Sequence, residues 1–557
     1  MVRATFSGFN TALSALQANQ KRLDITGQNL SNMNTAGYTR QQLEASSLNY
    51  TNPVSHYSNG NETAVGFGVS MDRVSQIRDP YLDIQYRSQS ADCSYTNRLQ
   101  TALNSLSKVL DETTISGIRQ AFDDIQSTLT SMQDPAKVSD PIYESELRSK
   151  MQSVCNLFNQ ASRQISQAEQ NEFQRLTGEG SSEQGDVQKI NDILRQIGDL
   201  NVQIKRNQVA GHPSLELQDE RNLLLDELSG YIPIETRYYK DDAHSGNNAY
   251  DHDANGAVIG KKDWPDDLEV SMNYIDTQGK SQKLILVNGS DLGTDGLTKN
   301  YGQLSVLKGD HQTAASVSDP ANISIKFEKA PSYKGKGQAA ADVYAELKGI
   351  RFEGGSLQAS LDMLQKTGTG NVIKGSTAVD DVRGYQYYSG KLDQLASTFA
   401  KSMNDINNGK KHTDKNLLSN STDDSTNDIT AGNIGISKGW TSGTIHISTD
   451  GTNRTDTVLD MIAAMKDTTK LNGKTFADYM NNLSTQLASD SSSNQTALKT
   501  GTTVLNSIQD SRDSLSGVSL DEEATNMMAY VSAYNAASRL MTALDEVLNT
   551  LISNTGA

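Results

Sequence analysis

The sequence predicts an α+β multidomain protein that combines a terminal helical coiled coil, an elongated helical bundle and an inserted β-rich outer domain. Three observations support this fold class. Both chain ends repeat apolar residues every three to four positions, long helical stripes flank the middle of the chain, and the middle itself alternates with a period of two. With 557 residues, the chain exceeds the size at which a single core stops growing, so several domains are expected.

These patterns are nested along the chain. We expect a terminal coiled-coil assembly domain from residues 1–60 plus 515–557, a mainly helical bundle domain from 61–230 plus 351–514, and a β-rich outer domain from 231–350. A chain laid out in this way brings its two ends together. We therefore expect the β-rich domain to lie farthest from the chain ends.

The composition argues against several partners. A formal net charge of −17 is unfavourable for binding nucleic acid, because phosphate contacts need clustered Lys and Arg. No segment approaches the roughly 18 apolar residues of a membrane span, and the N-terminus lacks an uninterrupted apolar core of signal-peptide length. We expect no nucleic acid, no membrane insertion, and a chain that is cytoplasmic or exported without cleavage. Cys93 and Cys155 are expected to be semi-buried free thiols.

Both chain ends are predicted to form amphipathic helices with narrow apolar seams. The predicted seams consist of Val2, Phe6, Phe9, Leu13, Leu16 and Leu23 at the N-terminus and Met527, Val531, Tyr534, Met541 and Leu548 at the C-terminus. Basic residues dominate the first segment and acidic residues the second, which favours pairing of the two helices, seam against seam. Two such helices are marginal alone. They can dock onto the body of their own monomer, or they can become ordered only when partner subunits bind, and the pattern does not distinguish these two cases.

The interior of the chain shows the change of period. Helical stripes recur over residues 118–132, 147–168, 187–204, 392–406 and 476–515, and two Asp-Pro pairs at 134–141 interrupt them. Residues 268–274, 283–289 and 322–329 instead read as strands. The Ser-, Thr- and Asn-rich stretch 412–433 is expected to be an exposed loop.

Chemical motifs are scarce. Asp251, Asp253, Asn255 and Gly256 match the first half of a calcium loop, but position twelve is Lys262 instead of a bidentate Glu. A surface turn is therefore the favoured interpretation of this weak calcium-like candidate. A chain without a convergent titratable cluster is more typical of an assembly component than of an enzyme, and we expect no cofactor.

The stretch that follows the first helix resembles a known family. Asn29, Asn32, Asn34, Thr35, Gly37, Tyr38 and Arg40 resemble the N-terminal signature of flagellar rod, hook and hook-associated proteins. Residues 516–552, with Leu-Asp-Glu-Glu at 520–523, look like the C-terminus of the hook-associated protein 1 family, and 223–236 and 354–364 support this. The sequence departs from the family pattern at 365–381 and in the histidine-containing stretch 244–252.

The resemblance implies a structural role at the bacterial flagellum. Proteins of this family are exported unfolded by the flagellar type III apparatus and form a ring at the hook tip that joins hook to filament outside the cell. The implied partners are the hook protein, a second hook-associated junction protein, copies of the chain itself, and an export chaperone on the C-terminal helix around Met527 and Met541. A hook or rod subunit is the nearest alternative, and a secreted protein with an enzymatic or adhesive outer domain is a more distant one.

The asparagine-rich turn is expected to belong to the same assembly interface. Asn29, Asn32 and Asn34 are expected to cap the first helix and redirect the chain. Gly37 is free to adopt a positive φ, and Tyr38 is expected to act as an amphipathic anchor.

Overall fold

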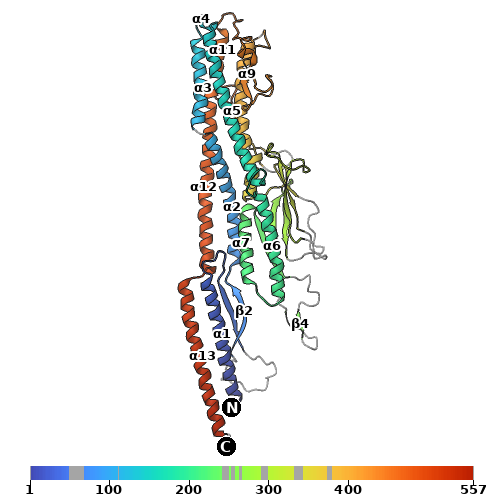
Figure 1. Cartoon of the computed structure of the whole chain (residues 1–557), viewed down its shortest axis with the longest axis vertical. Coiled ribbons are helices and arrows are strands. Elements are labelled where there is room, and N and C mark those ends of the chain that lie inside the picture. Colours follow the sequence, from blue (N-terminus) through green and yellow to red (C-terminus); the bar gives the residue numbers. More distant parts are fainter. Residues whose placement is uncertain are drawn as a thin grey trace.

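The computed structural model is an elongated molecule in which the first and last helices lie side by side at one pole (Figure 1). It describes residues 2–48, 68–110, 112–240, 250–252, 258–261, 266–289, 299–330, 343–372, 379–409 and 411–555. The helices are α1 (Val2–Ser31), α2 (Pro80–Val109), α3 (Glu112–Ser131), α4 (Pro135–Val138), α5 (Pro141–Thr177), α6 (Asp186–Val209), α7 (Leu215–Tyr231), α8 (Ser356–Gln365), α9 (Tyr385–Asn408), α10 (Lys438–Thr441), α11 (Asp456–Lys466), α12 (Phe476–Ser516) and α13 (Leu520–Thr555).

The strands are short and form several small antiparallel sheets. They are β1 (Gln41–Ser47), β2 (Val69–Gln76), β3 (Ile234–Lys240), β4 (Tyr250–His252), β5 (Val258–Lys261), β6 (Asp266–Ile275), β7 (Ser281–Asn288), β8 (Gln303–Lys308), β9 (Ile323–Glu328), β10 (Val343–Ala345), β11 (Leu418–Asn420) and β12 (Ile434–Ile436). The two largest sheets have the strand orders β3-β6-β7 and β10-β9-β8.

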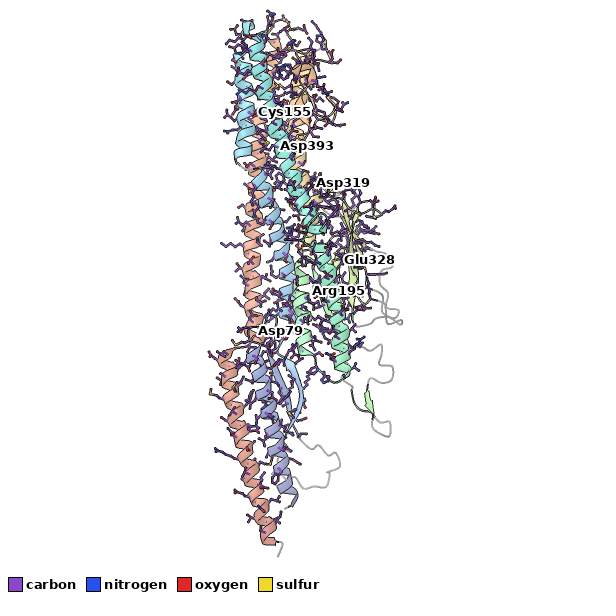
Figure 2. All side chains as sticks on the ribbon, viewed as in Figure 1. Asp79, Cys155, Arg195, Asp319, Glu328 and Asp393 are labelled. Atoms are coloured by element: carbon purple, nitrogen blue, oxygen red, sulfur yellow. The ribbon has the colours of Figure 1, made fainter. Side chains whose placement is uncertain are left out.

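The terminal part of the molecule contains α1, α13 and the β1–β2 ribbon. Gln41 pairs with Gln76 and Ser47 with Val69, so the strands run antiparallel. The domain boundary expected at residue 60 falls between these two strands. Because strand pairing holds β1 and β2 together, we place the boundary after β2, where Asp79 caps α2 with Pro80 in the first helical turn (Figure 2).

The helical body is built around α2 and α12, which run antiparallel along the long axis (Figure 1). As expected, the two Asp-Pro pairs break the helical pattern: Asp134 and Asp140 cap α4 and α5. Four buried phenylalanines from four helices meet at the far end, where Phe122 contacts Phe158, Phe399 and Phe476 with ring centroids 6.0, 5.2 and 5.7 Å away. Cys93 and Cys155 are free thiols, as predicted, but both are buried and not semi-buried.

The β-rich part shows the predicted alternation, but it lies elsewhere than expected. Leu268, Val270 and Met272 are buried on β6, and Ile325 and Phe327 on β9. The expectation that this part is farthest from the chain ends is wrong: α4 and α11 occupy the far pole, and the sheets lie beside α6 partway along the molecule (Figure 1).

Buried asparagines explain this lateral position. On α6, Asn201 Nδ2 donates to Leu268 O (3.2 Å) and Gly289 O (3.1 Å). In return, Asn300 Nδ2 donates to Gly198 O (2.9 Å). These bonds satisfy backbone carbonyls of the sheet and of α6, so the sheet is held against the side of the helix.

The stretch 412–433 is more than an exposed loop. Leu417 and Leu418 are buried, and β11 pairs with β12. Asn404 Oδ1 accepts from the backbone of both leucines (2.8 and 2.9 Å). Polar composition misled the prediction because two apolar residues are enough to anchor the segment. None of the described helices combines the length and apolarity that a bilayer span requires.

Candidate assembly site

The pairing of α1 with α13 has a defined antiparallel register. A methyl group placed at Gly8 would lie 3.4 Å from Leu544 Cδ1. Arg22 stacks over the Tyr530 ring at 5.6 Å, and Asn29 Nδ2 donates to Glu523 Oε2 at 3.4 Å. From Gly8 to Arg22 is 22 − 8 = 14 residues, and from Leu544 back to Tyr530 is also 544 − 530 = 14. The contacts therefore follow the heptad spacing of an antiparallel coiled coil.

The face of α1 that is buried differs from the predicted seam. The buried residues of α1 are Ala12, Ala18, Asn19, Ile25, Thr26 and Asn29. Phe9, Leu16 and Leu23 are half-buried, and Leu13 is 47% exposed. Val2 and Phe6 lie in α1, but only their backbone is described.

The predicted seam-to-seam packing within one chain is therefore wrong for this part of α1. Ala12 precedes the predicted seam residue Leu13 by one residue, and Asn19 and Thr26 follow Ala12 at intervals of seven, so the buried stripe is rotated by about 100° from the predicted seam. Small and polar residues allow a closer approach to α13 and the β1–β2 ribbon than leucines do. The larger apolar side chains are left at the flank of the pair.

A similar displacement occurs on α13. Ala537 and Glu523 are its buried residues, while Met527, Met541 and Leu548 are half-buried. Two of the predicted seam residues, Val531 and Tyr534, are exposed. We define the α13 apolar face as its exposed large apolar residues, which lie on both flanks of the side that contacts α1 and reach around to the opposite side: Leu520, Met528, Val531, Tyr534, Leu540, Val547, Leu551 and Ile552. Such a run of exposed apolar side chains is typical of a surface that binds a partner.

The asparagine-rich turn closes the inner end of this pair. Asn29 Oδ1 accepts from Tyr38 OH (2.9 Å) and from Gln41 N (3.0 Å), and Asn29 Nδ2 donates to Gln41 O (3.0 Å). Burial, together with the nearby charge of Asp219, raises the pKa of Tyr38 to about 12, so the phenol remains a hydrogen-bond donor. Gly37 has φ +78°, the positive value anticipated for it.

The other two asparagines are less involved. Asn32 Nδ2 donates to Gln28 O (3.0 Å) in the last turn of α1, and Asn34 is exposed. Of the three asparagines singled out in the motif, Asn29 is therefore the one that connects the turn to α13.

Arg40 joins three segments of the chain. Its side chain pairs with Glu523 (Nε–Oε1, 2.8 Å) and Glu522 (Nη2–Oε1, 2.9 Å). Its backbone N–H donates to Ser516 O (2.9 Å), and its carbonyl accepts from Ile77 N (2.8 Å). Burial acts to lower the pKa of Arg40, but the hydrogen bonds and charges of the two glutamates outweigh it and raise the pKa. We call Asn29, Arg40, Glu522 and Glu523 the clasp.

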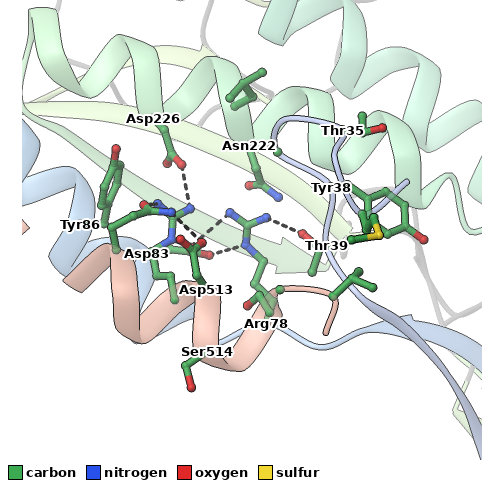
Figure 3. Close-up of a pocket in the computed structure, with 18 of the residues that line it drawn as sticks. Thr35, Tyr38, Thr39, Arg78, Asp83, Tyr86, Asn222, Asp226, Asp513 and Ser514 are labelled. Atoms are coloured by element: carbon green, nitrogen blue, oxygen red, sulfur yellow. Dashed lines mark hydrogen bonds and ion pairs between the residues drawn. The ribbon is translucent and has the colours of Figure 1, made fainter. Parts of the chain in front are cut away.

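Behind the clasp lies a network of charges, and Arg78, Asp83, Asp226 and Arg512 of this network line a cavity of about 810 Å³ (Figure 3). We define the elbow network as the side chains of Arg78, Arg87 and Arg512 with those of Asp83, Asp219 and Asp226. It contains as many arginines as aspartates, so the charges balance.

The elbow network links α2, α7 and α12 to the turn after α1. Arg512 on α12 binds Asp83 of α2 (3.1 Å) and Asp226 of α7 (2.7 Å). Thr39 in the turn donates from Oγ1 to Asp219 Oδ1 (2.6 Å). Burial raises the pKa of Asp219, and the bonds from Thr39 work against that rise. Sequence reasoning did not find this network, because its members lie up to 434 residues apart (512 − 78) and share no local motif.

The clasp and the elbow network are suited to holding the turn after α1 against α2, α7, α12 and α13. Among the residues that the structure describes, no group of three or more His, Cys, Asp or Glu side chains is placed to hold a metal ion. Asp253 and Asn255 of the calcium-like candidate lie outside the described residues, and of Asp251 only the backbone in β4 is described. The site brings together Asn29 and Tyr38 from the predicted set, with Gly37 shaping the turn.

Family models match this chain over most of its length. The model of the flagellar hook-associated protein FlgK helical domain matches residues 103–418. The chain belongs to the FlgK family of flagellar hook-associated proteins. The flagella basal body rod protein model matches residues 9–39, and the C-terminal model of flagellar basal body rod FlgEFG proteins matches residues 511–554. The paired terminal helices are thus the part that resembles other axial proteins.

Individual relatives agree with the family models. The chain is 28% identical to flagellar hook-associated protein 1 of Bacillus subtilis over 572 aligned positions, which cover 99% of both chains. It is also 28% identical to flagellar hook-associated protein 1 of Salmonella typhimurium over 230 positions, 41% of this chain and 38% of that one. The solved hook junction protein FlgK of Burkholderia pseudomallei overlaps 61% of this chain and 45% of its own at 19% identity, with a TM-score of 0.37, which is too weak for a domain-by-domain comparison.

These relatives are structural proteins of the flagellum. Family membership supports a structural role of this chain at the hook–filament junction. The rod-type models at both chain ends imply contact with other axial components of the flagellum.

Proposed function

We propose that this chain assembles as a ring at the tip of the flagellar hook, outside the cell, and joins hook to filament. Its partners are copies of itself, the hook protein and a second hook-associated junction protein. The observation that carries the proposal is the α13 apolar face, which is exposed although α13 already pairs with α1. Partners that cover this face would gain about 25 cal/mol for each Å² of apolar surface buried.

The predicted seam residues fit this role in the assembled state. Leu13 and Val531 are exposed in the single chain, and Phe9, Leu16 and Leu23 are half-covered. These side chains are therefore available to neighbouring subunits while Ala12, Asn19 and Ala537 hold the two helices of one subunit together. The sequence left open whether the terminal helices dock within one monomer or bind partner subunits. In this proposal they do both, because they dock within one chain and still expose a surface for a partner.

Export is part of the same proposal. The family resemblance implies passage through the flagellar type III apparatus without cleavage, and a chaperone that holds α13 before export. Met528 is 66% exposed, and Met527 and Met541 are half-buried. Methionine-rich faces adapt to more than one partner, so one surface can serve the chaperone first and the ring later.

The proposal is tested by a charge on the α13 apolar face. Val531→Asp is expected to leave the monomer folded, because Val531 is already 43% exposed, and to prevent filament attachment because a partner would have to bury the carboxylate. Ser532→Asp is the matched control, since it adds the same charge one residue away at an exposed position that is already polar. Both variants are expressed in a flagellated strain that lacks its own copy, and hooks and filaments are counted by electron microscopy.

The expected result is hooks without filaments for Val531→Asp and normal filaments for Ser532→Asp. Normal filaments with Val531→Asp would contradict the proposal. A hook or rod subunit remains the second candidate, because the models that match both chain ends are rod-type models. That candidate predicts that the hook itself is missing in the deletion strain, and the same micrographs distinguish the two.

A further inference from the structure

We propose that the clasp is a register lock: Asn29 and Arg40 on one side and Glu522 and Glu523 on the other are positioning residues that select one alignment of α1 along α13. This inference concerns the folded single chain. It holds whether or not the chain forms the ring proposed above.

The seam between α1 and α13 does not select a register strongly by itself. Gly8 faces the half-buried Leu544, and the buried residues of the pair include Ala12 and Ala537. Because the contacts repeat every seven residues, a shift of one heptad again places seam positions against seam positions. Small residues fit such a shifted partner without a clash, so packing alone discriminates poorly between alignments.

One shifted alignment is even favoured by charge. If α13 moves by one heptad away from the body, Arg22 leaves Tyr530 and comes level with Glu523, seven residues earlier. An Arg–Glu pair at that point would be attractive. The native alignment therefore needs a feature that holds Glu523 where it is.

The clasp provides this feature. Glu523 is 2% exposed and accepts from both Arg40 and Asn29. A heptad shift moves it by about 10 Å along the axis and removes both donors. Asn29 does not follow, because its amide is also engaged by Tyr38 and by the backbone of Gln41. Arg40 does not follow either, because its backbone is bonded to Ser516 and Ile77. A buried carboxylate left without these partners is costly.

The connection to α12 strengthens the lock. Only residues 517–519 separate α12 from α13. To lengthen this link by about 10 Å while Glu523 stays on the helix, roughly five residues at the end of α12 would have to change from helix to extended chain. Ser516 is the last of those residues, and its carbonyl accepts from the backbone N–H of Arg40. As long as Arg40 holds Ser516 and both glutamates, this unwinding is opposed.

Disulfide trapping in the full chain tests the proposal. The native register places Ala15 level with Ala537, midway between the Gly8–Leu544 and Arg22–Tyr530 contacts. Ala15→Cys with Ala537→Cys reports the native alignment, and Gly8→Cys with Ala537→Cys reports the alignment shifted by one heptad. The native thiols are buried and remain in place, and a chain with Ala537→Cys alone gives the background. Oxidation is mild, the protein is dilute, and the monomeric cross-linked fraction is measured over time.

Each cysteine pair is compared in the parent chain and in the double variant Asn29→Ala with Arg40→Gln. This variant leaves the Glu523 charge intact, so Arg22 is free to attract it. The matched control combines Asn34→Ala with Arg539→Gln, the same two changes at exposed positions in the turn after α1 and on α13.

The native pair is expected to form its disulfide at least about tenfold faster than the shifted pair in the parent and in the control, because only nearby Cα atoms can be bridged. In the clasp variant, this preference is expected to fall below about threefold. An unchanged preference would overturn the proposal, since the seam would then set the register. Loss of both cross-links would also overturn it, because the clasp would then hold the helices together without choosing their alignment.

Discussion

The two long antiparallel helix pairs α1–α13 and α2–α12 have similar seams but different surroundings. In the α2–α12 pair, a methyl group at Gly501 would lie 3.0 Å from Cys93 Sγ, and Asn494 Nδ2 donates to Gln100 Oε1 (3.0 Å). The α1–α13 pair likewise uses a glycine, alanines and a buried asparagine. Both seams are therefore built from small and polar residues that permit close approach and hydrogen bonding.

The two pairs differ in whether their helices also pack into the main hydrophobic core. The first part of α12 packs Phe476, Met480, Leu483 and Leu487 into the main core. On α13, in contrast, Ala537 is the buried apolar residue, and the larger side chains form the exposed α13 apolar face. A polar seam is thus sufficient for a helix pair that is anchored in a core. The same kind of seam at the chain ends leaves the apolar surface to be covered by partners.

The largest effect that separates the two pairs is expected from the same substitution in each. Leu483→Ala on α12 removes a side chain that is 2% exposed, and it is expected to lower the free energy of unfolding by about 3 kcal/mol through lost burial and the cavity left behind. Leu540→Ala on α13, at a side chain that is 48% exposed, is expected to change it by less than about 0.5 kcal/mol. Urea unfolding followed by circular dichroism measures both.

Equal effects of these two variants would break the comparison. If Leu540→Ala destabilised the isolated chain as much as Leu483→Ala, the α13 apolar face would already be covered within the monomer. Its assignment to partner binding would then lose its support.

A second contrast concerns two buried glutamates. Glu523 in the clasp is paired with Arg40, whereas Glu169 on α5 accepts from the amide of Gln386 (2.6 Å). Burial raises the pKa of Glu169 from 4.5 to about 7, with Gln386 opposing the rise. Because the folded-state pKa is raised, the stabilisation is complete below pH 4.5 and is lost as the pH rises through about 7.

Glu169→Gln is therefore expected to stabilise the chain in alkaline solution. At pH 8.5, the gain in free energy of unfolding is expected to be about 2 kcal/mol, and it should vanish near pH 4.5. Glu183→Gln, at an exposed position in the following loop, is the control and should show little pH-dependent difference. A gain that is the same at both pH values would mean that the carboxylate charge is not its cause.

Much of the fold was predictable because it depends on local periodicity. The helical stripes, the Asp-Pro breaks and the alternation of β6 and β9 all appear where apolar spacing places them. The pairing of the two terminal helices was predicted from their opposite charges. Which face of α1 is buried did not follow, because the pattern marks where apolar residues lie, whereas the pair is packed by Ala12, Asn19 and Thr26.

The site was predictable only in part. Asn29 and Tyr38 stood out because they belong to a dense local motif. Glu523, the partner of Asn29, lies 494 residues away in the chain, and the elbow network connects α2, α7 and α12 in the same long-range manner. Likewise, the lateral position of the β-rich part depends on asparagine contacts to α6 that no local pattern reveals. Contacts of this kind depend on tertiary arrangement and have no sequence period.

The smallest expected effect tests how the two helix pairs are coupled. Arg512 on α12 pairs with Asp83 and Asp226 and stacks over the Tyr86 ring at 4.3 Å. Arg512→Gln is expected to cost only about 1 kcal/mol, because Arg78 and Arg87 continue to pair with the two aspartates. Arg195→Gln, at a half-exposed surface pair, should cost less than about 0.5 kcal/mol.

Amide hydrogen exchange in the Arg512→Gln variant shows which of the two helix pairs supports the other. If the inner pair supports the outer one through the elbow network, Arg512→Gln should accelerate amide exchange at the start of α13 by about fivefold and leave amides near Gly501 unchanged. The direction follows from the packing, since α12 is anchored in the core by Leu483 and its neighbours, and α13 has no comparable anchor among the described residues. Faster exchange near Gly501 with α13 unchanged would reverse the dependence, and the terminal pair would then be the element that stabilises the body.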